Sequence, residues 1–353
     1  MKKRILIVNQ AQFGYHIDYV QYSRYLKDDF DVTYLCWDYG WDKIEEPGIS
    51  IQYINRDGNV LKRNIHFIRA IAKVLKQSHY DFILIHYFRG CAVVPVLFNR
   101  KQLISLDIRT GNDSDKFTAR VFNNALLYFE SLFFKRISIV SESLRKYLKI
   151  SKTAYILPLG ANIMCYKKNI RNRISLIYVG TLTNRRIEDT IIGFEMFLKK
   201  NPDADISYTI IGNGWKNELE LINKIVEKLN LKNHIFIKGY IPHKDLINYY
   251  AQANVGVSWV PVTNYYNYQP ATKTFEYLMA GMPVIATSTY ENKRIINEQN
   301  GFNIDDTPED FANCISNLQH CISKYDEESI RSTVSEYKWE DIVLRMKNEF
   351  INK

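Results

Sequence analysis

The stretch ISLIYVGTLTNRRIEDTIIGFEMFLKKNPDADISYTIIGNG (174–214) contains two apolar runs with an amphipathic segment between them. The runs at 174–180 and 205–214 have the length and composition of buried strands, and 186–201 has a helical pattern. A strand, a helix and a second strand in this order form a parallel pair, with the helix covering one face of the sheet. The stretch therefore predicts an α/β fold built on a parallel sheet.

The same alternation continues on both sides of this stretch. Strands are expected at 3–9, 31–36, 81–87, 102–108 and 137–140, then at 234–240, 254–260 and 283–287, and apolar spacing predicts a helix at 59–78. The pattern pauses at 157–173, which is polar and basic in its second half and is interpreted as a linker. We therefore expect two Rossmann-like parallel-sheet domains facing a cleft, at 1–160 and 161–335. An amphipathic helix at 336–353 either packs on its own domain or crosses back to the first.

Composition narrows the class of protein. The 353 residues are 46% hydrophobic and 24% charged, as in a globular chain, and the five cysteines form no CxxC pair, which argues against a disulfide or zinc scaffold. No uncharged apolar run reaches the roughly 18 residues of a membrane span. The net charge is +9 without a nucleic-acid-binding motif. We expect a cytoplasmic protein that does not bind nucleic acid and contacts the inner face of the cell membrane peripherally, a solvated basic face being the alternative.

Four segments of the second half resemble one enzyme family. They are YVGTLTNRR (178–186), TIIGNG (209–214), IFIKGYIPHKDLINYYAQANVGVSW (235–259) and PATKTFEYLMAGMPVIAT (270–287). Their content and order are similar to the retaining glycosyltransferases of family 4, the glycosyl transferases group 1, which have two facing Rossmann domains (GT-B). The resemblance implies a C-terminal domain that binds a nucleotide-diphosphate sugar as donor substrate, with no other cofactor.

The resemblance assigns a donor site around the segment 270–287. It implies that Glu276 accepts hydrogen bonds from the ribose hydroxyls, and a carboxylate has the two acceptor oxygens that a vicinal diol needs. We place Glu276 in the first turn of a helix, where negative charge is favoured, and expect backbone N–H groups of Thr272, Lys273 and Thr274 to face phosphate. Lys273 would add its ammonium group. The alternatives are a solvated acid and a surface lysine.

This chain departs from the family at three points. The family has a glutamate where Gln269 stands, and that residue contacts the transferred sugar. Where the family has an arginine after the glycine of YVG (178–180), this chain has Thr181. Where the family has a lysine further on, this chain has Arg186, with Arg185 beside it. We therefore expect Arg186, Arg185 and Lys273 to neutralise the diphosphate, since arginine gives bidentate phosphate contacts. The alternative for the arginine pair is an ordinary charged loop.

The N-terminal half matches the family loosely and offers acceptor-side candidates. Gly14 follows the first strand and is assigned to the donor phosphate, or to an ordinary turn. Asp107 and Arg109 follow another strand and are candidates for binding an acceptor hydroxyl or phosphate, unless Asp107 only orders its own loop. His86 ends a strand and is either acceptor-side or structural. We assign Asp107, Arg186 and Lys273 to catalysis, and His86 and Arg109 to the acceptor side.

The sequence predicts a metal-independent reaction, because no HExxH motif and no paired histidines occur. The leaving diphosphate would be stabilised by cations and helix N-termini. The leading interpretation is a glycosyltransferase of capsule, O-antigen or exopolysaccharide synthesis that acts with retention on a lipid-linked or oligosaccharide acceptor. A non-catalytic nucleotide-sugar-binding or partner subunit, suggested by Gln269, and a nucleotide-sugar 2-epimerase remain alternatives.

Overall fold

The computed structural model describes residues 2–98, 102–114, 116–163, 173–215 and 217–352. Most of the expected linker at 157–173 lies outside these residues. The chain divides into two compact units, Met1–Pro158 with Trp339–Lys353, and Leu159–Lys338. The sequence placed the boundaries at 160 and 335. The C-terminal unit is thus one continuous segment, whereas the N-terminal unit is built from both ends of the chain.

The N-terminal unit contains a seven-stranded sheet with strand order β3-β2-β1-β4-β5-β6-β7. The strands are β1 (Lys3–Val8), β2 (Phe30–Asp38), β3 (Ile49–Asn55), β4 (Phe82–His86), β5 (Ile104–Ile108), β6 (Arg136–Ile139) and β7 (Tyr155–Ile156). Every adjacent pair is parallel. The register places His86 opposite Asp107, so the carboxyl ends of β4 and β5 adjoin.

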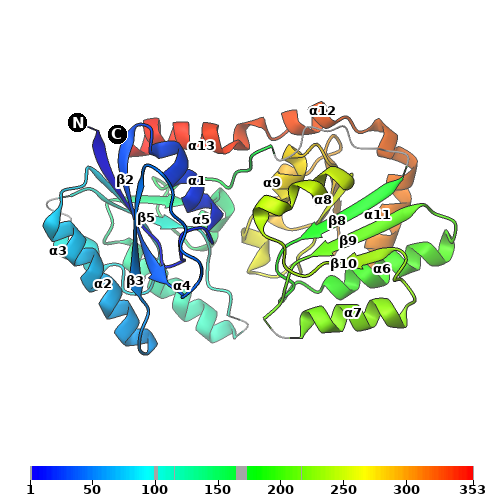
Figure 1. The fold of residues 1–353 in the computed structure, drawn as a ribbon, viewed down its shortest axis with the longest axis horizontal. Coiled ribbons are helices and arrows are strands. Elements are labelled where there is room, and N and C mark those ends of the chain that lie inside the picture. Colours follow the sequence, from blue (N-terminus) through cyan, green and yellow to red (C-terminus); the bar gives the residue numbers. More distant parts are fainter. Residues whose placement is uncertain (1, 99–101, 115, 164–172, 216, 353) are drawn as a thin grey trace. The chain divides into compact units, whose positions relative to one another are not determined.

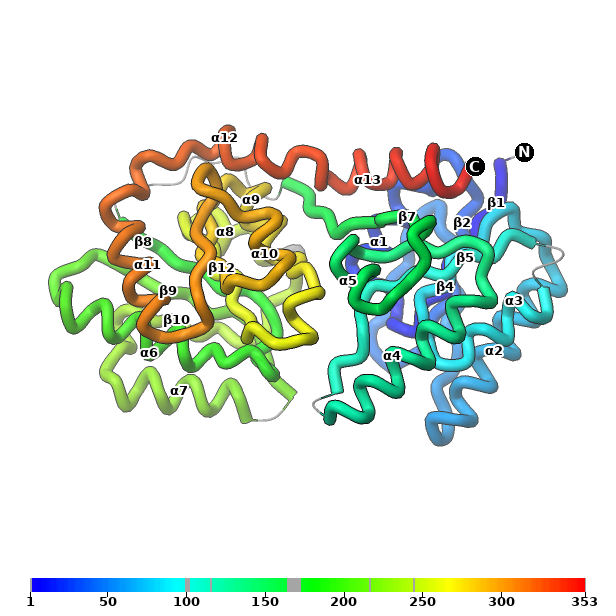
Figure 2. The backbone as a smooth tube through the Cα atoms, turned by 180° about the vertical axis from the view of Figure 1, so that it is seen from behind, coloured from blue at the N-terminus to red at the C-terminus, as the bar shows by residue number. Residues whose placement is uncertain are grey.

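Helices cover both faces of this sheet. They are α1 (Ile17–Leu26), α2 (Val60–Gln77), α3 (Val93–Phe98), α4 (Phe117–Ser131), α5 (Glu142–Tyr147) and α13 (Trp339–Met346), which continues as a π-helical turn at Lys347–Ile351. Figures 1 and 2 show α2, α3 and α4 on one side of the strands and α1 with α13 on the other. Trp339 is 2% exposed and its ring centroid lies 5.7 Å from that of Tyr22 on α1. The last helix is therefore part of the core of the N-terminal unit.

The C-terminal unit contains a six-stranded sheet with order β10-β9-β8-β11-β12-β13, again parallel throughout. Its strands are β8 (Ile174–Val179), β9 (Ile206–Ile211), β10 (Ile235–Ile237), β11 (Val255–Ser258), β12 (Val284–Thr287) and β13 (Gly301–Ile304). Its helices are α6 (Ile187–Lys200), α7 (Glu218–Lys228), α8 (Ile247–Gln252), α9 (Thr272–Met279), α10 (Tyr290–Ile295), α11 (Pro308–Cys321) and α12 (Glu327–Ser332).

The core of this unit explains the strand-helix alternation. Ile191 and Phe194 on α6 are fully buried against Tyr208 and Ile210 of β9 and Phe311 of α11. Strands buried on both faces carry continuous apolar runs, which is why the runs at 174–180 and 205–214 are visible in the sequence. The predicted parallel α/β fold is confirmed. The short or half-exposed strands β3, β7 and β13 were not predicted.

Candidate functional site

Helix α9 begins near the point where the strand order of the C-terminal sheet reverses, between β8 and β11. Strand β8 pairs with β9 on one side and with β11 on the other, so their outgoing connections diverge and leave a crevice at the carboxyl ends. Two contacts hold α9 there. The Val179 N–H donates to the Tyr277 hydroxyl at 2.8 Å, and a Cβ on Gly256 would lie 2.3 Å from Cγ of Tyr277. Glycine at 256 thus permits the close packing that positions α9.

Lys273 lies in the first turn of α9 with its ammonium group at the end of β8. Nζ is 4.0 Å from the ring centroid of Tyr178 and donates to the carbonyl of Trp259 at 3.3 Å. Burial, followed by the nearby positive charge of Arg185, lowers the pKa of Lys273 well below its usual value. An anion entering this crevice would therefore meet a lysine whose charged form it stabilises.

Glu276 lies on the same helix, in its second turn. It is the fifth residue of the helix, which starts at Thr272, and the first turn contains no acid. The expectation of a first-turn carboxylate is wrong, because the helix already begins at Thr272, one full turn before Glu276. Oε2 accepts a hydrogen bond from the Tyr250 hydroxyl at 3.0 Å, and Oε1 lies 3.7 Å from Nε2 of His243. The side chain is 15% exposed, so the carboxylate is held in place but remains accessible.

The remaining residues of this segment have different surroundings. Thr272, the first residue of the helix, and Gln269, three residues before it, are both half-buried. The Thr274 N–H donates to the Ala271 carbonyl at 3.0 Å, and its buried hydroxyl lies 2.7 Å from that of Ser258. The N–H and hydroxyl groups of Thr274 are thus both occupied within the structure.

The two arginines of the 178–186 segment point to different partners. Arg185 donates to the Tyr266 hydroxyl, and its guanidinium lies 4.4 Å from the centroid of that ring. Arg186 has a left-handed backbone (φ 52°) before α6 and forms ion pairs with Asp189 at 2.5 Å and Asp306 at 3.0 Å. Two carboxylates therefore neutralise Arg186, whereas Arg185 acts electrostatically on Lys273.

Glycines end the strands beside α9. Gly180 follows β8, Gly212 follows β9, and Gly239 lies just beyond β10. The Gly212 N–H donates to the Gly239 carbonyl at 2.8 Å, and a Cβ on Gly212 would lie 1.8 Å from the carbonyl oxygen of Gly180. Gly212 has φ +152°. No side chain fits between these turns, so backbone lines this edge of the crevice.

A buried polar cluster lies at the carboxyl ends of β4 and β5 in the N-terminal unit. Asp107 is fully buried within β5 and accepts hydrogen bonds from Tyr19 at 2.5 Å and Ser138 at 2.7 Å. Arg109 is 4% exposed, pairs with Asp18 at 2.5 Å and donates to the Leu157 carbonyl at 2.6 Å. Both residues were expected in an open loop. The structure places them instead in a network beneath the surface.

Two imidazoles lie above this cluster. The ring of His86 is 5.1 Å from that of His16, and both contact Tyr19. Nδ1 of His16 lies 3.0 Å from Nδ2 of Asn9, which donates to it. Burial and the charge of Arg109 lower the pKa of His16 to about 3, and burial with His16 lowers that of His86 well below normal. The sequence reasoning missed His16, although its place directly before α1, facing the end of β4, was a usable signal.

Gly14 lies in the turn between β1 and α1. Its φ is +99°, and an added Cβ would lie 2.3 Å from Cδ1 of Ile44. The backbone conformation favours glycine, whereas the Ile44 methyl group is the far end of a flexible side chain and can shift. This explains Gly14 by local structure without any ligand.

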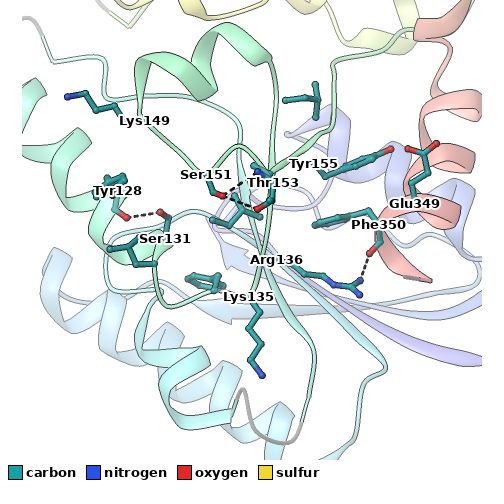
Figure 3. Close-up of a pocket in the computed structure, with 15 residues that line it drawn as sticks. Tyr128, Ser131, Lys135, Arg136, Lys149, Ser151, Thr153, Tyr155, Glu349 and Phe350 are labelled. Atoms are coloured by element: carbon teal, nitrogen blue, oxygen red, sulfur yellow. Dashed lines mark hydrogen bonds between the residues drawn. The ribbon is translucent and has the colours of Figure 1, made fainter.

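A pocket of about 720 Å³ lies elsewhere in the N-terminal unit (Figure 3). Lys135 and Arg136 line it at the start of β6, with the stacked rings of Tyr155 and Phe350. Arg136 donates to the Phe350 carbonyl at 2.6 Å. Since β6 begins here, the pocket is at the opposite end of the strands from His86 and Asp107, and it contains none of the predicted site residues.

The part of the chain that the structure describes contains neither a metal-ion cluster nor a membrane-spanning helix. There, no group of three or more His, Cys, Asp or Glu side chains is arranged to hold a metal ion. No helix among these residues is long and apolar enough to cross a bilayer.

Comparison with solved structures identifies the fold. Across 98% of both chains, the fold matches sucrose-phosphate synthase from Thermosynechococcus elongatus (TM-score 0.78, 18% identity) and Alr3699/HepE from Anabaena (0.76, 13%). It also matches the lipopolysaccharide outer core galactosyltransferase WaaB over 98% of both chains (0.68, 12%). The fold is that of the GT-B glycosyltransferases.

A match to a known family covers a segment of the C-terminal unit. Residues 173–320 match the family model described as Glycosyl transferases group 1. No curated protein sequence matches the chain significantly. The resemblance of the four sequence segments to the glycosyl transferases group 1 is confirmed, and the matched residues include Arg185, Lys273 and Glu276.

Proposed function

We propose that this protein is a glycosyltransferase that moves a sugar from a nucleotide-diphosphate sugar to a saccharide acceptor. The observation that supports it best is the crevice beside α9, where Lys273 and Glu276 lie on one helix next to glycine turns that present backbone. A cation and exposed backbone suit a diphosphate, and a fixed carboxylate suits a ribose diol. The Anabaena relative was solved with UDP and with UDP-glucose, which makes UDP the first nucleotide to test.

Within this proposal the diphosphate contacts are assigned to Lys273 and Arg185. The sequence favoured Arg186 as the catalytic arginine, but its two carboxylate partners reduce the charge it offers to a ligand. Arg185 has a tyrosine partner, which leaves its positive charge uncompensated by an acid among the contacts shown. Binding of the diphosphate would also restore the charge of Lys273.

The proposed reaction proceeds with retention and without a metal. The bond between the anomeric carbon and the phosphate oxygen breaks, and the acceptor oxygen forms a new bond on the same face. The acceptor proton passes to the leaving phosphate oxygen. Positive charge on the sugar in the transition state lies next to the departing diphosphate. Lys273 and Arg185 stabilise that diphosphate.

The acceptor side is assigned to the N-terminal unit. His86 is half-buried at a strand end, and its lowered pKa keeps the imidazole neutral at physiological pH. A neutral imidazole accepts a hydrogen bond from a hydroxyl group, which suits a sugar acceptor. Asp107 and Arg109 would act beneath it as positioning residues, since both are buried.

We further propose a cytoplasmic role in cell-surface polysaccharide synthesis with a lipid-linked acceptor. Support comes from the likeness of the fold to WaaB, a lipopolysaccharide outer core galactosyltransferase. The alternative of a non-catalytic binding subunit rests on Gln269. The alternative of a nucleotide-sugar 2-epimerase rests on the shared double-Rossmann plan. Gln269 keeps hydrogen-bonding ability without charge.

Product analysis after a ligand screen tests the proposal. Thermal unfolding is measured with UDP-, GDP-, ADP- and dTDP-sugars, since a ligand at a hundred times its Kd adds about 2.7 kcal/mol. The stabilising donor is then incubated with acceptors with and without EDTA. A new glycoside formed in EDTA supports the proposal. Donor binding without product indicates a binding subunit, an altered free sugar nucleotide indicates an epimerase, and strict dependence on added metal contradicts metal independence.

A further inference from the structure

We propose that helices α2, α3 and α4 form a docking face for a lipid bilayer with an anionic surface. The face is defined here as the exposed apolar and basic side chains of these three helices and of the turn after α4. The inference rests on surface chemistry alone and is independent of the transferase activity.

The first observation is a set of large apolar side chains that face solvent. Val60 and Leu61 are each 70% exposed, Phe117 is 67% exposed and Phe122 is 65% exposed. Burying such side chains in the core would be the ordinary outcome for a soluble surface helix. The other exposed apolar members are Ile65, Val93, Val96, Leu97, Val121, Phe129, Leu132 and Phe133. A concentration of this size indicates an interaction site.

The second observation is the charge of the same helices. Their only acid is Glu130, which is buried and accepts hydrogen bonds from the Tyr87 hydroxyl at 2.9 Å and the Gly90 N–H at 2.6 Å. Other acids precede these helices in the sequence, Asp57 before α2 and Asp113 and Asp115 before α4. The basic residues are Lys62, Arg63, Arg69, Lys73 and Lys76 on α2, Arg120 on α4 and Lys116 directly before it. The exposed charge on these helices is therefore entirely positive.

The third observation is that the helices form one side of the unit. Asn64 of α2 donates to the Arg89 carbonyl at 3.2 Å, and the Arg89 guanidinium donates to Asn123 of α4 at 2.5 Å. Both views of the fold show α2, α3 and α4 on the same side of the sheet (Figures 1 and 2). The apolar and basic side chains are thus available to one extended partner.

An anionic bilayer fits this combination better than other partners. Phenylalanine and leucine enter the acyl boundary while lysine and arginine remain at the headgroups. A second copy of the same face would oppose like charges. Nucleic acid would satisfy the cations but leaves aliphatic side chains such as Val60 and Leu97 without a partner, because phosphate contacts are polar.

Flotation with vesicles tests the inference on the full chain. Vesicles of phosphatidylcholine with and without phosphatidylglycerol are used at low and high salt. We expect binding to the anionic vesicles at low salt, release at high salt because exposed charges are screened, and little binding to the neutral ones. The triple variant Leu97→Ser, Phe122→Ser, Phe129→Ser should bind at least tenfold more weakly.

A matched triple variant provides the control. Ile192, Leu221 and Leu344 are 38%, 47% and 50% exposed and lie on α6, α7 and α13, so serine at all three should leave vesicle binding unchanged. Circular dichroism and UDP calorimetry show that both variants remain folded and separate this test from the proposed function. The proposal would be overturned if the parent protein did not bind anionic vesicles, if both triple variants lost vesicle binding equally, or if the face variant still bound. So would a dimer in sedimentation that the face variant abolishes.

Discussion

Glu276 shows how one carboxylate is prepared for a ligand by its neighbours. Tyr250 donates to one oxygen and His243 lies near the other, so the side chain has one orientation before any ligand arrives. A fixed acceptor loses less conformational entropy on binding than a mobile one.

We expect Glu276→Ala to lower the affinity for the donor nucleotide at least tenfold. Loss of a charge-assisted hydrogen bond costs about 1.5–3 kcal/mol. Isothermal titration calorimetry with UDP, or with the nucleotide that stabilises the protein, measures this affinity. Glu276→Gln keeps the shape of the side chain and one acceptor oxygen, so its affinity should fall less. Unchanged affinity in Glu276→Ala would remove this residue from the site.

The two arginines give a second prediction at this scale. Arg185→Ala should lower turnover more than Arg186→Ala, because Asp189 and Asp306 neutralise Arg186 in the folded protein. Initial rates at saturating donor compare the two. The reverse order would show that the ion pairs of Arg186 open when the donor binds.

His16 predicts a pH dependence of stability. Its pKa is about 3 in the folded state and about 6.5 when unfolded, so between these values the unfolded chain binds the extra proton. Stability should therefore fall as pH is lowered from 6.5 toward 3. Urea midpoints at pH 7 and pH 5 should differ less in His16→Asn than in the parent protein. His66→Asn, on the exposed side of α2, is the control, and an undiminished difference in His16→Asn would contradict the assignment.

At the scale of elements, the strand-end glycines determine how closely β8, β9 and α9 approach. Gly212→Ala should destabilise the C-terminal unit and weaken donor binding, because a Cβ at 1.8 Å from the Gly180 oxygen forces the backbone apart. We expect a loss of about 1–3 kcal/mol.

Gly40→Ala is the matched comparison for this change. Gly40 has φ +76° with no atom within 4 Å of an added Cβ, so only backbone strain of about 1–2 kcal/mol applies. Urea unfolding and nucleotide titration measure both variants. Equal donor affinity in Gly212→Ala and the parent protein would show that the turn is not part of the site.

The elements were largely predictable, whereas the partners of individual side chains were not. Buried strands such as 174–179 show as apolar runs, and α2 shows as a helical period. One of the two partners of Arg186, however, is Asp306, 120 residues away, and no local pattern connects them. The burial of Asp107 likewise depends on Tyr19 and Ser138 from other elements. The resemblance identified the segment, but tertiary contacts decide which arginine is available.

At the scale of the whole molecule, the N-terminal unit depends on the last residues of the chain. Trp339, Ile342 and Val343 are buried among residues of α1 and the sheet. Trp339→Ala should therefore destabilise this unit by about 3–5 kcal/mol. Limited proteolysis followed by mass spectrometry should show faster cleavage within 2–158 than within 173–338. Leu344→Ala, at a half-exposed position on the same helix, should have little effect. Equal protection of the two units in Trp339→Ala would contradict this dependence.

The division of the N-terminal unit between the two ends of the chain also determines the order in which the protein is assembled on the ribosome. Residues up to Pro158 emerge first, but the helix that completes their core follows only after Leu159–Lys338 has been made. At about 5–20 residues per second, that interval is on the order of tens of seconds. The continuous C-terminal unit can fold as soon as it emerges. The first-made half of the protein is thus the last to be finished, and during that time its apolar α1 surface is open to chaperones.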